Sequence, residues 1–369
     1  MTKPKHSLKN RDLAELLAVE AETKEFPAKR ALRRAARLAH LWTEDAGDLV
    51  RRDVPLTELA GVGPYIQRVM RGWIGDPPAM PKRPKIREEF LTLTEARAIL
   101  AGNPFWLRGI RGDLQMHTTW SDGSGSIKEM AEAGEERGYE YIAITDHSQG
   151  LKIAGGIDAQ QLEEQGAEID ALNASLASQN KSIRVLRSIE LNLNPAGQGD
   201  MEQRSLEPLD LVLGCFHSSL RKKEDQTDRY IAALRNPQIQ ILGHPRGRIY
   251  NHRVGLTADW PRVFAVAAEL DKAVEIDSYP DRQDLSLDLV RLAAKAGCRI
   301  SLGTDAHGPG QLRFMEFGAA AALLAKVKRD RILNFMERDE LLGWAARLRG
   351  EDQTSERRAR IQSSLRAGI

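Results

Sequence analysis

The sequence predicts an α/β protein: a distorted, seven-stranded TIM-like barrel preceded by a small all-α domain. Three observations lead to this fold class. Residues 10–74 show only helical patterns around one glycine-containing turn. From residue 110 onward, short apolar segments alternate with helical patterns, as in a β/α barrel. Polar side chains follow almost every apolar segment at its end, which favours a barrel over the alternative of a doubly wound open sheet, because barrel strand ends converge on one mouth.

Composition sets the broad class. Of the 369 residues 41% are hydrophobic and 29% are charged, which is typical of a soluble globular protein. No run of about 18 apolar residues is present, so we expect no membrane span. Residues 1–6 lack the apolar core of a secretory signal. Cys215 and Cys298 lie in predicted buried strands and are expected to be reduced, which favours a cytoplasmic location.

The charge is unevenly distributed along the chain. Residues 1–88 carry 18 Lys and Arg against 12 Asp and Glu, whereas the whole protein has a net charge of only +2. A basic N-terminal part beside a mildly acidic remainder favours a module that binds a polyanion such as DNA. Ordinary surface charge is the alternative.

The N-terminal domain, residues 1–75, is predicted to be helical. Asn10 is a candidate cap for the first helix, and a second helix over 28–42 gathers several arginines. Gly61-Val62-Gly63 then separates two helical patterns, as in a helix-hairpin-helix motif, in which backbone amides at a helix start face a phosphate. The candidate DNA-binding residues are Gly61, Gly63, Arg68 and Arg71. A purely structural pair of helices is the alternative.

Three further regions complete the predicted organisation. A proline-rich basic linker covers 76–108, the barrel covers 109–350, and a charged tail covers 351–369. Ser126 and Glu129 are expected to form a capping box at one barrel helix. The predicted strands of the barrel are 110–117, 141–145, 183–191, 209–217, 239–243, 273–277 and 299–304.

Metal-capable side chains occur at nearly every predicted strand end. Side chains two apart on a strand share a face, so Gln115 and His117 point together. The full candidate ligand set is Gln115, His117, Asp122, His147, Glu190, His217, His244, Asp305 and His307. Mixed imidazole and carboxylate ligands suit zinc, manganese or iron. The set exceeds what one ion takes, so two or three divalent ions are implied, an arrangement suited to hydrolysing phosphate esters.

These motifs carry a family resemblance. The segments Asp113-Leu114-Gln115-Met116-His117, Ser121-Asp122-Gly123, Thr145-Asp146-His147-Ser148, Ile189-Glu190, Phe216-His217-Ser218, Gly243-His244-Pro245 and Thr304-Asp305-Ala306-His307 resemble, in order, those of the polymerase and histidinol phosphatase (PHP) family. With residues 10–74, 154–156, 243–248 and 280–285, the chain resembles the PHP domain and the N-terminal region of bacterial family X DNA polymerases. The polymerase core is missing, so no nucleotidyl transfer is expected.

The resemblance implies roles for individual residues. One ion would be held by His117 and Asp305 with position 115, and Glu190 would bridge to a second ion at His217 and His244. Asp122, His147 and His307 would hold a third. Glu190, His217 and Asp305 are the candidate catalytic residues, and Arg246 or Arg248 the candidate phosphate-binding residue. Gln115 departs from the family, which has histidine there, and an amide oxygen is the weaker ligand for such an ion.

Three functions remain open. The leading one is a metal-dependent phosphoesterase that acts on DNA, as a 3′–5′ exonuclease or in 3′-end processing during repair. The alternatives are a small-molecule phosphatase resembling histidinol phosphatase and a DNA-binding protein with a partly decayed metal site.

Overall fold

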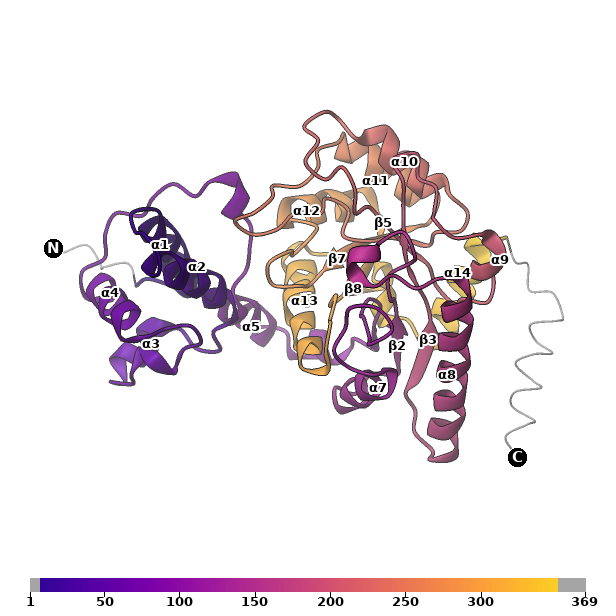
Figure 1. Ribbon diagram of the computed structural model, residues 1–369, viewed down its shortest axis with the longest axis horizontal. Coiled ribbons are helices and arrows are strands. Elements are labelled where there is room, and N and C mark those ends of the chain that lie inside the picture. The colour runs from indigo at the N-terminus through magenta and orange to yellow at the C-terminus, as the bar shows by residue number, and fades with distance from the viewer. Residues whose placement is uncertain (1–6, 351–369) are drawn as a thin grey trace. The chain divides into compact units, whose positions relative to one another are not determined.

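The computed structural model describes residues 7–350, so the predicted tail at 351–369 lies outside the described residues. The chain divides into two compact units (Figure 1). Unit 1 comprises residues 1–103 together with 249–254, and unit 2 comprises 104–248 and 255–369. In the described part of the chain, no helix is long and apolar enough to cross a membrane.

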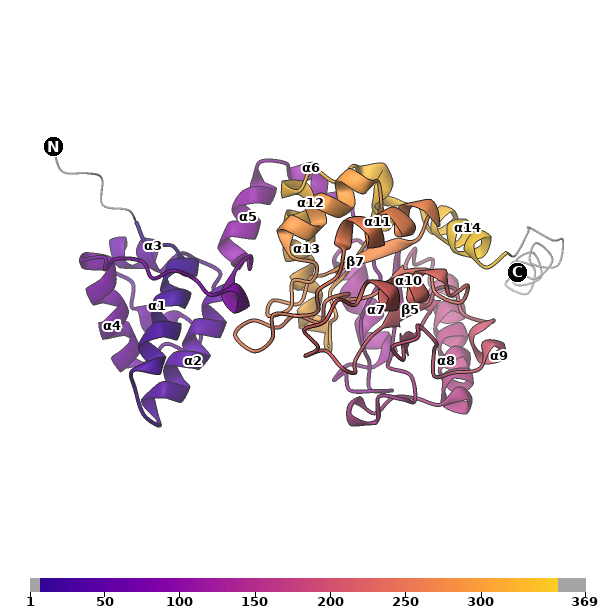
Figure 2. The ribbon, with the colours of Figure 1, turned by 90° about the horizontal axis from the view of Figure 1, so that it is seen from above.

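Unit 1 is helical. Its helices are α1 (Asn10–Glu22), α2 (Ala28–Leu38), α3 (Ala46–Arg51), α4 (Pro64–Gly75) and α5 (Leu93–Ala101), of which α1 to α4 are grouped in Figure 2. Asn10 does not cap α1, because Lys9 occupies that position. The Asn10 amide instead donates to Glu44 O and accepts from the backbone N–H of Ala46 at 3.0 Å, so it holds the start of α3.

The turn before α4 has the geometry that its glycines predict. Gly61 has a φ of +80°, and a Cβ atom there would lie 2.6 Å from Leu38 Cδ1, so both its backbone and its surroundings require glycine. Gly63 is the N-cap of α4 and Pro64 is its first residue. The backbone N–H groups of the first turn of α4 therefore point out of the helix end without intrahelical acceptors.

Six residues from the second half of the sequence complete unit 1. Residues 249–254 form a short loop in which Ile249 and Arg253 pair, and Tyr250 packs edge-on against His40 and Phe90. Arg87 makes two hydrogen bonds to Glu15 and a third to Asn251. Unit 1 is thus built from two stretches of sequence.

Unit 2 contains eight parallel strands in two sheets. The three-stranded sheet has the order β1-β2-β3 and the five-stranded sheet β4-β5-β6-β7-β8. The strands are β1 (Gly112–Asp113), β2 (Tyr141–Ile144), β3 (Arg184–Arg187), β4 (Glu190–Asn192), β5 (Leu213–Cys215), β6 (Ile241–Leu242), β7 (Ala273–Asp277) and β8 (Arg299–Gly303). The count differs from the predicted seven, because the strand expected over 183–191 divides at Ser188 and Ile189 between the two sheets.

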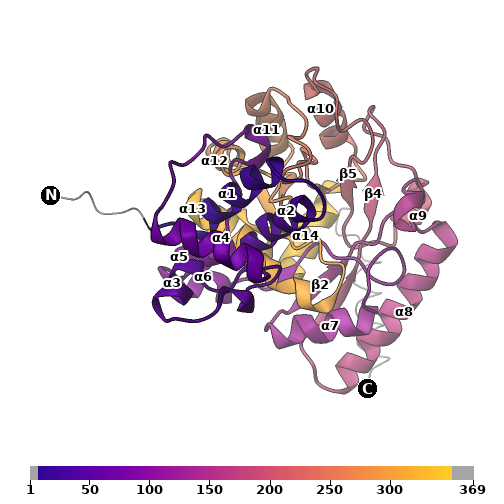
Figure 3. The same ribbon diagram turned by 60° about the vertical axis from the view of Figure 1, so that its left-hand side comes forward.

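Single bridges join the two sheets at two places. Met116 pairs with Ala306 beyond the ends of β1 and β8, and His147 pairs with Glu190 between β2 and β4. Helices surround the strands (Figures 1 and 3). They are α6 (Pro104–Arg108), α7 (Ile127–Glu136), α8 (Ala159–Ser178), α9 (Gln203–Leu206), α10 (Thr227–Arg235), α11 (Trp260–Glu269), α12 (Leu287–Ala296), α13 (Met315–Leu324) and α14 (Arg338–Leu348). The predicted capping box of Ser126 and Glu129 is present at α7.

The N-terminal ends of the strands are covered by the last described segment. Tyr141 donates its hydroxyl hydrogen to the carbonyl oxygens of Leu333 and Met336, and Trp344 of α14 donates to Asp271 O at 3.0 Å. These aromatic side chains belong to one apolar cluster with strand residues such as Leu213 and Ile241. Since this end is packed with apolar groups, the polar side chains gather at the opposite, C-terminal ends of the strands.

Candidate metal centre

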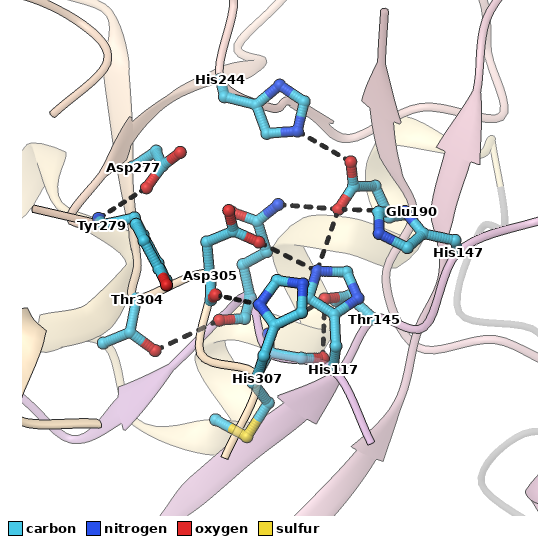
Figure 4. Close-up of polar contacts among 12 residues, drawn as sticks. His117, Thr145, His147, Glu190, His244, Asp277, Tyr279, Thr304, Asp305 and His307 are labelled. Atoms are coloured by element: carbon cyan, nitrogen blue, oxygen red, sulfur yellow. Dashed lines mark hydrogen bonds and ion pairs between the residues drawn. The ribbon is translucent and has the colours of Figure 1, made fainter. Parts of the chain in front are cut away.

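Glu190, the first residue of β4, lies at the middle of the polar cluster (Figure 4). Its Oε1 is 2.8 Å from Nε2 of His217 and 2.7 Å from Nε2 of His244. Its Oε2 is 3.2 Å from Nε2 of His117 and 3.8 Å from Nδ1 of His147. One carboxylate therefore faces four imidazoles, which come from four different strand ends.

A second group of candidate ligand side chains lies on the solvent side of His117. Asp122 Oδ1 is 3.6 Å from Nε2 of His147 and 3.4 Å from Nε2 of His307. The ring centroid of His117 is 4.3 Å from that of His147 and 4.5 Å from that of His307. Asp305 completes the centre, with its Oδ1 3.0 Å from Nε2 of His117.

Hydrogen bonds from neighbouring groups fix the orientation of several ligands. Nδ1 of His217 lies 3.1 Å from the side-chain oxygen of Asn192, and Nδ1 of His307 lies 2.7 Å from Asp305 O. In both rings Nε2 therefore faces the carboxylates, as in metal sites where the other nitrogen is held by an outer partner. Asp305 itself has a φ of +51°, an uncommon conformation for a non-glycine residue.

Other polar residues of the motifs support the backbone of the site. Asp113 accepts from both the backbone N–H and the hydroxyl of Thr304, which ties β1 to the end of β8. Asp146 accepts from the N–H and hydroxyl of Thr118 and from the amide of Gln165. These two buried carboxylates thus position the loops that carry the ligands.

The donor atoms form four overlapping groups that could hold metal ions. Within each, the donor atoms lie within 4.8 Å of one another. They are His117 with Asp122, His147 and His307; His147 with Glu190 and His217; Glu190 with Cys215 and His244; and His117 with Glu190 and Asp305. The structure therefore brings together all eight predicted His, Asp and Glu ligands. His147 belongs to both the first and the second group. His217 and His244, which were expected to hold the same ion, belong to different groups.

The side chains present fit divalent metal ions. Buried donor atoms without a hydrogen-bond partner in the described residues include His117 Nδ1, His147 Nδ1 and His244 Nδ1. Buried polar atoms are usually satisfied, so such a concentration of unsatisfied imidazole nitrogens suits the binding of a cation. Imidazole nitrogen and carboxylate oxygen suit zinc, manganese and iron, and the clustered groups can bind several ions.

The charges of the centre support the same conclusion. Burial alone would raise the pKa of Glu190, but the neighbouring His147 and His244 and the hydrogen bonds with His117 and His217 hold it well below its ordinary value. Burial lowers the pKa of His147 to about 3. The centre thus holds Glu190 as an anionic carboxylate among imidazoles.

Gln115 lies in the centre with its amide nitrogen toward Glu190. Nε2 donates to Glu190 Oε2 at 2.9 Å, while the amide oxygen Oε1 has no hydrogen-bond partner among the described residues. Gln115 was predicted to lie beside His117, and both side chains contact Glu190 Oε2. The atom of Gln115 that makes this contact is the amide nitrogen, whereas the amide oxygen was expected to bind a metal.

The predicted substrate-binding and DNA-binding residues lie outside this cluster of ligands. Arg246 donates through Nε to Leu256 O at 3.3 Å, and Arg248 is buried with its backbone N–H directed to Asp284. In unit 1, Arg68 is exposed, whereas Arg71 donates to Val54 O at 3.2 Å.

Four residues of the centre were not predicted from the sequence. Cys215 on β5 shares a strand face with His217, so the same period-two pattern could have identified it. Glu275 and Asp277 are buried charges in the otherwise apolar strand β7, which is itself a signal. Arg282, whose Nε lies 3.1 Å from Asp305 Oδ2, belongs to the segment 280–285 that carries part of the resemblance, but no role was predicted for it from the sequence.

Comparisons with known proteins agree with this geometry. The PHP domain matches residues 113–304. The chain is 38% identical over 226 residues to the DNA polymerase/3′-5′ exonuclease PolX of Bacillus subtilis, a match that covers 61% of this chain but only 39% of that protein. It is 25% identical over 234 residues to a probable phosphatase of Thermoanaerobacter sp., covering 60% of this chain and 89% of that protein.

Among solved structures, similarity is found to a histidinol phosphate phosphatase of Lactococcus lactis complexed with zinc, L-histidinol and phosphate. The identity is 17%, the TM-score is 0.38, and the match covers 57% of this chain and 94% of the other. A likeness of this degree supports no inference on its own. The domain match extends over more than half of the sequence, and six of the eight predicted His, Asp and Glu ligands, from His117 to His244, lie within it. The chain therefore belongs to the PHP domain family and is a metal-dependent enzyme that hydrolyses phosphoesters.

Proposed function

We propose that this enzyme hydrolyses phosphodiester bonds of DNA, as a 3′–5′ exonuclease or in 3′-end processing, by attack of a metal-activated water. The observation that carries the proposal is the Glu190 carboxylate facing four imidazoles at the mouth of unit 2. Divalent ions at such a centre lower the pKa of water and neutralise the attacking and leaving oxygens of a phosphoester.

Each part of the centre has a separate task in this reaction. Glu190 presents one oxygen to His217 and His244 and the other to His117, so it can serve ions on both sides at once. Asp305 and Asp122 add negative charge at opposite ends of the cluster. Together these residues would hold the ions and keep their spacing fixed while the phosphoester reacts.

The exposure of the ligands indicates the side from which the substrate approaches. The side chains of His117 and Glu190 are completely buried, whereas those of Asp122 and His307 are 36% and 24% exposed. A phosphate arriving from solvent would therefore meet the group formed by Asp122 and His307 first. The deeper residues then act on a phosphate that is already held.

The basic surface of unit 1 supports DNA as the substrate. Arg30, Arg34 and Arg37 of α2 are exposed, and the first turn of α4 offers backbone N–H groups after the Gly61–Gly63 turn. Positive side chains and helix starts are the usual contacts to DNA phosphates. Arg68 is exposed on α4 and is proposed as a further phosphate contact. Arg71 serves the fold of the motif instead, since its guanidinium is bonded to Val54 O.

Parallel assays on DNA and on small phosphate esters test the proposal. The purified protein, loaded with manganese, is incubated with a 3′-labelled oligonucleotide and separately with phosphate monoesters. We expect release of the 3′ label from the oligonucleotide, with none in the matched Glu190→Gln protein. Hydrolysis of monoesters alone would contradict the DNA proposal and favour the second candidate.

The second candidate is a small-molecule phosphatase. Two relatives named as probable phosphatases favour it, because the match with this chain covers most of the length of each of them. In that case the helical unit would contribute nothing to substrate affinity, and the charge reversals on α2 proposed in the Discussion would leave the rate unchanged.

A further inference from the structure

Arg282 sits in a loop whose backbone is closed at its base. The loop follows β7, and Asp277 and Asp284 pair across its neck through two backbone hydrogen bonds of 2.6 and 3.1 Å. Inside the loop, the N–H groups of Arg282 and Gln283 both donate to Tyr279 O at 2.9 Å. The position of residue 282 is therefore fixed by the fold rather than by its side-chain contacts.

The guanidinium of Arg282 reaches into the metal centre. Nε lies 3.1 Å from Asp305 Oδ2 and 3.9 Å from Asp277 Oδ2. Both carboxylates are almost completely buried, while 29% of the arginine side chain is exposed. Both ion pairs are made by Nε, and a guanidinium carries five N–H donors, so the two terminal nitrogens remain as donors for another group.

Asp305 links this arginine to the metal ligands. Its Oδ1 lies 3.0 Å from Nε2 of His117 and its Oδ2 lies 3.1 Å from Nε of Arg282. The guanidinium therefore lies beside the same carboxylate that contacts a ligand histidine.

We infer that Arg282 binds a non-bridging oxygen of the scissile phosphate through its terminal nitrogens, while Nε stays on Asp305. This inference rests on the proposed phosphoester hydrolysis at the same site. A guanidinium matches phosphate oxygens in geometry and charge, and a donor held rigidly beside the reacting group stabilises the charge that develops there. Arg246, one of the two candidates from the sequence, directs its Nε to Leu256 O instead.

Binding of inorganic phosphate to the manganese-loaded protein tests this role without using DNA. Calorimetric titration compares the wild type with Arg282→Ala, Arg282→Lys and a surface control, Arg291→Ala, whose arginine pairs with Asp288 on α12. We expect Arg282→Ala to weaken phosphate binding at least tenfold and Arg282→Lys to recover only part of the loss, because an ammonium lacks the fork of two donors. The control should bind as the wild type does.

Metal content, measured by elemental analysis on the same samples, separates phosphate binding from support of Asp305. Our inference requires that Arg282→Ala keeps its metal while losing phosphate affinity. Loss of metal in Arg282→Ala, with full recovery of both properties in Arg282→Lys, would show that the arginine only balances the buried carboxylates and would overturn the inference. Unchanged phosphate affinity in Arg282→Ala would do the same. Because the probe is inorganic phosphate, a protein that binds it through Arg282 but leaves DNA intact would refute only the proposed substrate.

Discussion

Gln115 Nε2 donates a hydrogen bond to Glu190 Oε2 at 2.9 Å, between two side chains that are completely buried. The amide therefore holds the central carboxylate from the side of β1. At the same time its oxygen has no hydrogen-bond partner among the described residues, so a rotation of the amide would offer that oxygen to a metal ion. In the structure the position supports Glu190, and we propose that after such a rotation it can also serve as a weak metal ligand.

Replacing Gln115 by histidine should strengthen metal binding. Imidazole is the better ligand for zinc and manganese, so Gln115→His is expected to raise the metal bound per chain and the rise in Tm on adding metal. Gln115→Ala should cost the metal-free protein about 1.5–3 kcal/mol, the usual contribution of a hydrogen bond to a charged group, with little change in metal content. Elemental analysis and thermal unfolding check both. If Gln115→Ala abolishes hydrolysis and Gln115→His restores nothing, the amide acts on substrate or water instead.

Removing the charge of Glu190 should affect catalysis far more than folding. Glu190→Gln keeps the shape of the side chain but loses the negative charge shared by the surrounding histidines, so metal content should fall and the hydrolytic rate should drop by orders of magnitude. Circular dichroism should remain as in the wild type. A rate within a few-fold of the wild type would show that Glu190 is not the shared ligand.

Reversing three charges on α2 should weaken DNA binding and its salt dependence together. The variant Arg30→Glu, Arg34→Glu, Arg37→Glu changes only exposed side chains, so the fold should be retained. Each lost phosphate contact reduces the slope of log K against log salt by about one. Fluorescence anisotropy with duplex DNA at several salt concentrations measures this slope. Equal slopes in the variant and the wild type would place DNA binding elsewhere.

The buried His40 should make unit 1 sensitive to mild acid. Burial lowers the pKa of His40 to about 4, below the ordinary 6.5. The unfolded chain then takes up a proton between pH 6.5 and 4 that the folded chain does not, so stability is lost as the pH falls through this window, by about 2 kcal/mol at pH 5.

Thermal unfolding of the wild type and of His40→Gln at pH 7 and pH 5 measures this effect. The wild type should lose more stability than the variant on acidification, because glutamine does not titrate. An equal loss in both proteins would show that other groups cause the acid sensitivity.

The clustering of the eight His, Asp and Glu side chains was predictable because strand ends in a β/α fold converge, and this depends only on finding the strands. The sequence could not show that the predicted third strand divides at Ser188 and Ile189, because the apolar residues at 183, 185, 189 and 191 keep a spacing of even numbers across the division. The position of Arg282 at the centre could not be predicted, for a different reason. Its role depends on a loop that folds back through pairing of Asp277 with Asp284, and such a contact has no periodic signature.

The six residues that return to unit 1 affect how this protein is made. During synthesis, residues 1–103 emerge first, but the ring of Tyr250 that packs against His40 and Phe90 is added about 150 residues later, roughly ten seconds at a usual rate of translation. Until then the nascent helical unit exposes part of its aromatic cluster. Glu190, His217 and His244 are all synthesised before Tyr250. The helical unit therefore reaches its final packing only after most of the residues that carry the ligands have been synthesised.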